Sequence, residues 1–176
     1  MPEQANMEVF LNSLDESRLH TSFTLLAPTL LGDEVPFVGA WYFRRSHPVQ
    51  EGESLDYITL YYDGDGKHIA VRQGFIGLPE AKDVTPADAH GTVQIQGKPA
   101  IWRDGVRQGD GWVRGLLSIG WQPNRIPVEV VGQTHVIGRE TDPGLPLTCA
   151  VLGQAAEVTL AELIEIAESV SVYSSR

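Results

Sequence analysis

The clearest pattern in the sequence lies between Leu55 and Phe75, where two alternating stretches flank a glycine-rich loop. Before the loop, one set of residues alternates with another, namely Leu55, Tyr57, Thr59 and Tyr61 with Asp56, Ile58, Leu60 and Tyr62. After the loop, Ile69, Val71, Gln73 and Phe75 alternate in the same way with Ala70, Arg72 and Gly74. A period of two places successive side chains on opposite faces of a β-sheet. The loop Asp63–Lys67 supplies the Gly and Asp residues that adopt positive φ in tight turns. The segment therefore predicts a β-hairpin, whose apolar face needs cover from further strands and a helix because a lone hairpin is marginal in water.

The chain is expected to close with an amphipathic helix over Leu160–Val170. Its apolar residues share one side at a period of 3.6, and they are Leu160, Leu163, Ile164, Ala167 and Val170. Thr159 and Glu162 have the spacing of a capping box, in which each side chain bonds the backbone N–H of the other residue. This helix must dock on the sheet, and a charge at Leu163 is expected to unfold the protein.

A second, shorter amphipathic helix is predicted near the start, within Ala5–Leu19, where apolar residues again recur at helical spacing. Between the helices, aromatic and branched residues bounded by turn residues predict further strands. These strands are Phe37–Arg45, Thr92–Gln96, Pro99–Arg103, Trp112–Trp121 and Ile126–Val131, with turns at Arg103–Gly111 and Gln122–Arg125. Either Trp41 or Tyr42 is expected to face the core.

Together these elements predict one domain over residues 1–176 of the α+β class. A curved, mostly antiparallel sheet carries the C-terminal helix across it and the short N-terminal helix at an edge. The segments Ser46–Glu53 and Gly77–Gly91 are expected to be surface connections.

Composition narrows the classes of partner. Thirteen Lys and Arg against 23 Asp and Glu give a net charge of −10, and no basic cluster offsets it, so nucleic acid is not an expected partner. No stretch approaches the roughly 20 apolar residues of a membrane-spanning helix. The cytoplasm is the expected location for the sequence as given, and an extracytoplasmic one if it is the soluble part of a membrane protein.

Candidate chemistry is sparse. The DGDGK loop at Asp63–Lys67 resembles the opening of a calcium loop, but twelve residues from Asp63 the sequence has Gly74 where a bidentate Glu is required. A single cysteine, Cys149, excludes an internal disulfide and a multi-thiolate zinc site. A hydrolase using Cys149 with His135 or His90 is a rival hypothesis, although the apolar run around Cys149 favours a buried structural thiol. No metal or cofactor is predicted.

Aromatic residues form the more informative set. The candidates for a ligand-binding surface are Trp41, Tyr57, Tyr61, Trp102 and Trp121. A sheet covered on one face can leave aromatics partly exposed on the other, as binding surfaces often do. The alternative is that these residues fill the core, because large aromatics dominate core burial. Any apolar groove between the sheet and the last helix is a further candidate site.

Two blocks of the sequence resemble a known family. The first runs from TSFTLLAPTLLGDEVPFVGAWYF to DYITLYYDGDGKHIAVRQG, and the second joins a LLSIGW strand to VTLAELIEIAESV. These blocks resemble small bacterial domains of unknown function at the extracytoplasmic end of anti-sigma-factor-like and sporulation-related membrane proteins. They are more distantly similar to lipoprotein-carrier and sigma-regulator sensor domains. Against that pattern, the sequence as given contains no membrane segment ahead of these blocks, and Gly132–Glu157 is expected to be an insertion.

The resemblance and the lack of a catalytic constellation favour a non-catalytic binding or sensing domain with a protein partner or an apolar small-molecule ligand. A carrier of a lipid or other apolar ligand in the groove between sheet and helix is the alternative, with the Cys-dependent hydrolase as a third hypothesis. The oligomeric state is left open.

Overall fold

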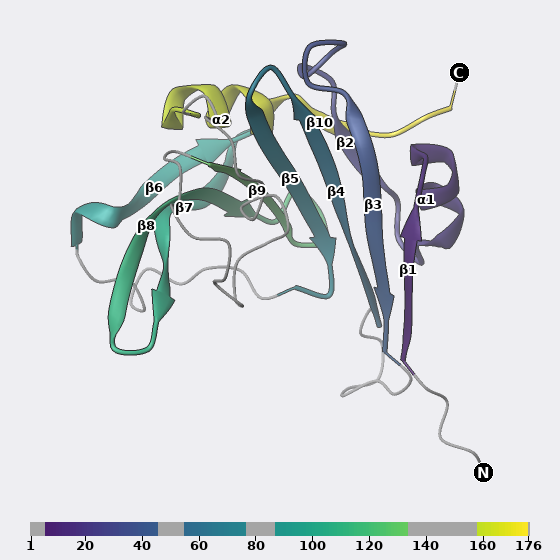
Figure 1. Cartoon of the computed structure of the whole chain (residues 1–176), viewed down its shortest axis with the longest axis horizontal. Helices are drawn as coiled ribbons and strands as arrows, with labels where there is room; N and C mark the ends of the chain where they lie inside the picture. The colour runs from purple at the N-terminus through teal and green to yellow at the C-terminus, as the bar shows by residue number, and fades with distance from the viewer. Residues whose placement is uncertain (1–5, 46–54, 77–86, 134–157, 176) are drawn as a thin grey trace.

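The computed structural model describes residues 6–45, 55–76, 87–133 and 158–175 of the 176-residue chain (Figure 1). Its helices are α1 (Leu14–His20), α2 (Leu160–Glu168) and a single 3₁₀ turn, η2 (Ala87–Ala89). The strands are β1 (Met7–Leu11), β2 (Leu26–Pro28), β3 (Phe37–Arg44), β4 (Asp56–Gly64), β5 (Lys67–Gly74), β6 (His90–Ile95), β7 (Lys98–Gln108), β8 (Gly111–Trp121), β9 (Val128–Gln133) and β10 (Val170–Val172).

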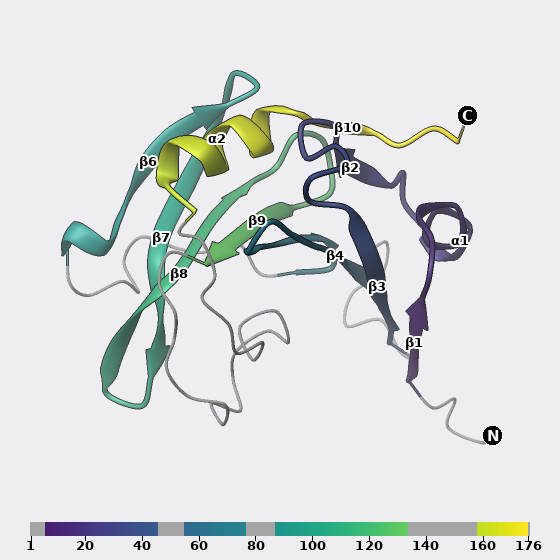
Figure 2. The same cartoon turned by 45° about the horizontal axis from the view of Figure 1, so that its top comes forward.

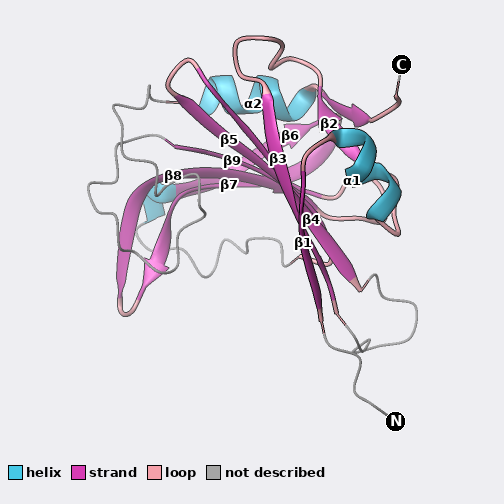
Figure 3. Cartoon of the chain, turned by 45° about the vertical axis from the view of Figure 1, so that its right-hand side comes forward, coloured by secondary structure: helices cyan, strands magenta, loops and turns pink. Residues whose placement is uncertain are grey.

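Eight of these strands form one antiparallel sheet in the order β1-β3-β4-β5-β9-β8-β7-β6. The short strands β2 and β10 pair with each other in a separate antiparallel ribbon. Figures 1 and 3 show the large sheet as an arch, with α2 lying over its top and α1 beside β1 and β3. The predicted α+β class, with a C-terminal helix across an antiparallel sheet and a short N-terminal helix, is confirmed.

The central hairpin forms as β4 and β5, and its alternation sorts the side chains as predicted. Ile58 and Leu60 are fully buried on the face that α2 covers, while Tyr57, Thr59 and Tyr61 point to the opposite face. The turn is tighter than the predicted loop, because only Asp65 and Gly66 lie between the strands, with φ of 54° and 71°. Two positive φ values in succession match the twist of the flanking strands.

The covering helix α2 is fixed at both ends by side chains. At its start, Thr159 Oγ1 accepts a hydrogen bond from Glu162 N at 3.1 Å, as the capping motif predicts. The Glu162 carboxylate instead pairs with Lys67 Nζ on β5 at 3.1 Å. Leu163, Ile166 and Ala167 are buried against the sheet, whereas Leu160 and Ile164 are only partly buried. The helix ends at Glu168, so Val170, predicted as its last residue, begins β10.

The ribbon of β2 and β10 lies on the same side of the sheet as α2 (Figure 2). Gln73 of β5 attaches it to the sheet, because this fully buried side chain accepts from Leu26 N and donates to Leu26 O, both at 2.8 Å. The amide therefore occupies the place of a neighbouring strand along the free edge of β2. The proline at Pro28 ends β2 but does not prevent it.

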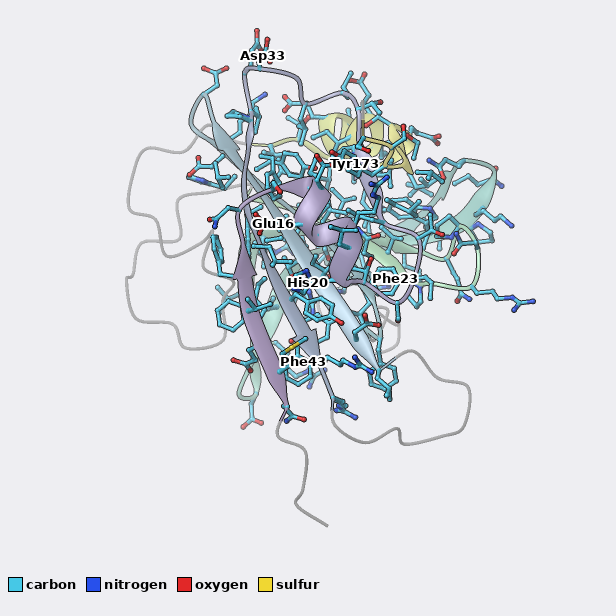
Figure 4. The ribbon with its side chains drawn as sticks, turned by 90° about the vertical axis from the view of Figure 1, so that its right-hand side faces the viewer. Glu16, His20, Phe23, Asp33, Phe43 and Tyr173 are labelled. Atoms are coloured by element: carbon cyan, nitrogen blue, oxygen red, sulfur yellow. The ribbon has the colours of Figure 1, made fainter. Side chains whose placement is uncertain are left out.

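At the N-terminus, the predicted helix is present but shorter than expected. Met7–Leu11 forms the edge strand β1 against β3, because pairing with β3 outweighs the helical spacing of these few apolar residues. The helix α1 begins only at Ser13, whose side chain accepts from Glu16 N at 3.1 Å. Figure 4 looks onto α1, with Glu16 and His20 on the helix in front of the sheet. Tyr42, and not Trp41, is the β3 aromatic that faces the core.

The predicted turn at Arg103–Gly111 is wrong over most of its length, because β7 continues to Gln108. The Asp104-Gly105 pair forms an irregularity within the strand, where Gly105 has a φ of 114°. Only Gly109 and Asp110 turn the chain into β8. Beyond this irregularity, Val106 packs against Ala70, Leu116 and Val131 on the sheet face opposite α2.

Some expectations lie outside the described residues. These are the loop Ser46–Glu53, residues 77–86 of the connection before β6, nearly all of the Gly132–Glu157 segment, and the side chains of Cys149 and His135. In the described ranges, no helix is long and apolar enough to cross a membrane.

Candidate functional site

A pocket of about 170 Å³ lies between α2, the start of β5 and the loop that joins β2 to β3. Its apolar lining comes from Leu30, Leu31, Val35, Ile69 and Ile166, and its charged lining from Glu34, Lys67, Glu162 and Glu165. This is the groove between the sheet and the last helix in which a ligand was expected. Figure 4 places Asp33, a neighbour of Glu34, at the tip of the β2–β3 loop.

Hydrogen bonds from the end of α2 position the loop that forms one wall of the pocket. Ser169 O accepts from Thr29 N at 3.3 Å, and Ser169 Oγ lies 3.2 Å from Thr29 N and 3.3 Å from Leu30 N. On the other side, the Lys67–Glu162 pair links β5 to the first turn of α2. The pocket therefore lies between segments that are about 140 residues apart in sequence.

The pocket lining carries more negative than positive charge. Lys67 and Glu162 form an ion pair, which leaves the exposed Glu34 and Glu165 as the two remaining charged residues of the lining. Leu30, also in the lining, has 55% of its surface exposed. The site thus combines an apolar floor with a negatively charged rim.

The face of the large sheet turned away from α2, here called the second face, carries three of the five predicted aromatics. Trp41, Tyr57 and Tyr61 all project from it and are partly buried. Tyr57 lies against Phe43, with the ring centroids 5.1 Å apart. Burial raises the pKa of Tyr61, while the nearby Arg72 opposes this shift. These aromatics gather over β3 and β4.

The other two predicted aromatics are on the opposite side of the sheet. Trp121 is 1% exposed and belongs to the core, and Trp102 packs against that core. The structure therefore separates Trp102 and Trp121 from the aromatics of the second face. One wide aromatic surface containing all five residues is not formed.

The centre of the second face holds charged residues that the sequence analysis did not single out. One cross-strand row from β1 to β6 consists of Phe10, Trp41, Thr59, Arg72, Glu129, Gly120, Ile101 and Thr92. The adjacent row consists of Gly39, Tyr61, Ala70, Val131, Ser118, Arg103 and His90. A usable signal was present, because Glu129 interrupts an otherwise apolar β-strand between Val128 and Val130.

A separate buried polar cluster, centred on Asp56, has a structural role. The buried carboxylate of Asp56 accepts hydrogen bonds from Ser22 N at 2.8 Å, from Ser22 Oγ, and from Tyr42 OH at 2.9 Å. Burial raises the pKa of Tyr42 well above its ordinary value, and the hydrogen bond to Asp56 adds to this shift. The two bonds from Ser22 fasten the chain after α1 to β4, and the bond from Tyr42 joins β3 to β4, so this carboxylate serves the fold.

No protein-family model matches the chain, and neither a curated protein nor a solved structure matches it.

Within the described residues, no group of three or more His, Cys, Asp or Glu side chains has the arrangement of a metal site. Asp63 of the DGDGK loop instead lies 3.0 Å from the buried His68 Nδ1 across the hairpin, without a hydrogen bond between them.

Proposed function

We propose that this chain is a non-catalytic binding module whose pocket beside α2 accepts an apolar side chain from a basic segment of a partner protein. The observation that carries the proposal is the pocket of about 170 Å³ with an apolar floor. A dry cavity of roughly 150 Å³ is enough for a group the size of benzene. One side chain of a partner matches that volume.

The charge of the rim favours a basic partner. Glu34 and Glu165 are exposed at the pocket, and the whole chain has a net charge of −10. Complementary charge speeds encounter and excludes acidic partners more than it adds affinity. A binding or sensing role is also what the resemblance to the bacterial domains of unknown function, and more distantly to sigma-regulator sensor domains, implies.

The volume argues against the carrier alternative at this site. Pockets for whole small molecules measure about 300–1,000 Å³, so this pocket is too small for a lipid chain. The hydrolase alternative depends on Cys149 and His135, which lie outside the described residues, while His90 lies on the edge strand β6.

The test is a titration of isotope-labelled protein with the pentapeptide Lys-Lys-Leu-Lys-Lys, followed by amide chemical shifts. We expect shifts at Leu31, Ile69 and Ile166. The peptide with serine in place of leucine should lose these shifts, because it has no apolar anchor. The peptide with glutamates in place of the lysines should also lose them, because the rim repels it. Equal binding of all three peptides, or of none, contradicts the proposal.

Two double variants separate the rim charges from general electrostatics. Glu34→Gln with Glu165→Gln removes two exposed rim charges, and we expect about fivefold weaker binding, which is about 1 kcal/mol for two exposed charge interactions. The matched control, Glu8→Gln with Glu16→Gln, changes the net charge equally on exposed residues of β1 and α1. An equal loss in both variants would show that only net charge matters.

A further inference from the structure

Three charged side chains meet in the middle of the second face and are here called the charged row, with Arg72 and Glu129 in one cross-strand row and Arg103 in the adjacent one. Glu129 of β9 accepts a hydrogen bond from Arg72 Nη1 of β5 at 3.0 Å, and its other carboxylate oxygen lies 3.9 Å from Arg103 Nη2 of β7. Strand β8 separates β7 from β9, and Gly120 is the β8 residue directly opposite Glu129. Because glycine has no side chain, Arg103 can extend across β8 to Glu129.

The accessible charge of this row is positive. The side chains of Arg72 and Arg103 are 38% and 26% exposed, whereas that of Glu129 is 4% exposed. Two guanidinium groups against one carboxylate leave a charge of +1 at the centre of this face, in a chain of net charge −10. An approaching ligand therefore meets the guanidinium groups and not the carboxylate that they share.

Two polar atoms at the β7 end of the row are buried without a partner. Among the described residues, neither Arg103 Nε nor His90 Nδ1 makes a hydrogen bond. His90 lies opposite Arg103 in the register of β6 and β7. Most buried polar atoms in proteins are hydrogen-bonded, so these two atoms at the charged cluster call for an explanation.

An apolar patch adjoins the charges. Ala70, Leu116 and Val131 are buried together, with Tyr61 and Val106 packed against them and partly exposed. Ala70 and Val131 lie two residues along their strands from Arg72 and Glu129. This spacing places the patch roughly 7 Å from the charged row on the same face.

We propose that Arg72 and Arg103 bind the carboxylate of a small organic ligand whose apolar body lies along Tyr61 and Val106. A planar guanidinium fork matches a carboxylate, and a single net positive charge matches a monoanion. Glu129 positions both arginines. Its negative charge also lowers the affinity of the site for an anion, so that binding is reversible. This site is separate from the pocket beside α2 and does not depend on the function proposed for it.

The test is a titration with phenylacetate, in which the ¹⁵N–¹H signals of Arg72 and Arg103 Nε and the amide signals of Ala70 and Val131 are followed. Benzyl alcohol, which has a similar ring and no charge, serves as the neutral probe. We expect phenylacetate to shift the arginine and patch signals together, with at least fivefold weaker binding of benzyl alcohol. Inorganic phosphate distinguishes a site for any anion from one that also requires an apolar body.

Two substitutions are expected to act in opposite directions. Arg103→Gln should weaken phenylacetate binding about tenfold, whereas Glu129→Gln should strengthen it severalfold, because the competing carboxylate is lost while the hydrogen-bonding shape remains. Arg125→Gln, an exposed arginine in the β8–β9 turn, is the matched control and should change binding less than twofold. A purely structural role for the row predicts no gain in Glu129→Gln.

Four results overturn the proposal: no shift with phenylacetate, equal binding of benzyl alcohol, equal binding of phosphate, or unchanged binding in Arg103→Gln. Thermal melting of each variant identifies any that fail to fold, and the opposite effect of Glu129→Gln then remains as the decisive comparison. Glu34→Gln with Glu165→Gln should leave phenylacetate binding unchanged. Failure of one site is thereby distinguishable from failure of the other.

Discussion

Gln73 makes the sharpest prediction about stability, because one side chain satisfies two backbone groups of another strand. Odd-numbered residues of the β2 region bond to β10, as in the hydrogen bond from Tyr173 N to Leu25 O and that from Thr29 N to Ser169 O. Leu26 therefore turns its N–H and C=O away from β10, and the Gln73 amide meets both at 2.8 Å.

In Gln73→Leu, both Leu26 groups lose their partner in a buried place. Each unsatisfied buried group costs about 1–3 kcal/mol, so the pair costs about 2–6 kcal/mol. A more apolar side chain at a fully buried position recovers about 1–2 kcal/mol. We expect a net loss of about 3 kcal/mol, which lowers Tm by about 6–12 °C for a domain of this size.

The assay is urea unfolding and thermal melting followed by circular dichroism, with Gln94→Leu as the control. Gln94 is exposed on the edge strand β6, and the same substitution there should change stability by less than about 0.5 kcal/mol. If Gln73→Leu melts within 2 °C of the wild type, the amide does not attach β2 to the sheet and the reasoning is refuted.

Gln73→Glu adds a test by pH. A buried carboxylate facing Leu26 O is disfavoured, so its pKa in the folded protein should be raised above that in the unfolded chain. A raised folded pKa means that stability is greatest at low pH and falls as pH rises through the folded value. The difference in Tm between Gln73→Glu and the wild type should therefore be smaller at pH 4.5 than at pH 8.

The remaining predictions concern the core. Leu163→Asp places a charge at a fully buried position of α2 and should abolish the cooperative melt, whereas unchanged melting would show that this helix is peripheral. Tyr42→Phe should lose about 1–3 kcal/mol because it removes a bond to the buried Asp56, whereas Tyr62→Phe should be neutral or stabilising, because the buried Tyr62 OH has no partner in the described structure. Burial raises the pKa of Tyr62 above that of a tyrosine in the unfolded chain. As pH rises above about 10, the unfolded tyrosine ionises first, so the free energy of unfolding falls. Tyr62→Phe should reduce that alkaline loss in urea unfolding at pH 9–11, and an unchanged slope would contradict this assignment.

Much of the fold could be predicted because it depends on local periodicity. The alternation in Leu55–Phe75 predicted both strands of the hairpin and the sorting of side chains to opposite faces within each strand. Prediction failed where pairing overrode a local pattern. The helical spacing of Met7–Leu11 yielded to pairing with β3, and the Asp104-Gly105 pair became a strand irregularity because β8 continues alongside it.

The candidate sites could be predicted less well, because they depend on register between distant strands. Arg72 and Glu129 are 57 residues apart and meet only because β5 pairs with β9, whose order in the sheet is not evident from the sequence. The aromatic candidates showed the same limit. Trp102 and Trp121 have the residue type of a binding surface, but their position in register places them on the α2 side of the sheet.

The two faces of the large sheet differ in the kind of side chain that they carry. α2 and the β2–β10 ribbon bury the apolar side chains of the face that they cover, including Ile69, Val71 and Val130. Arg72 and Glu129 occupy alternate positions of the same strands and therefore point away from that core. They are not stabilised by packing in it, yet they carry charge at the centre of the sheet. Keeping an ion pair there costs desolvation that an apolar pair avoids. A role in recognising a charged ligand accounts for that cost, and the opposite signs expected for Arg103→Gln and Glu129→Gln test this explanation directly.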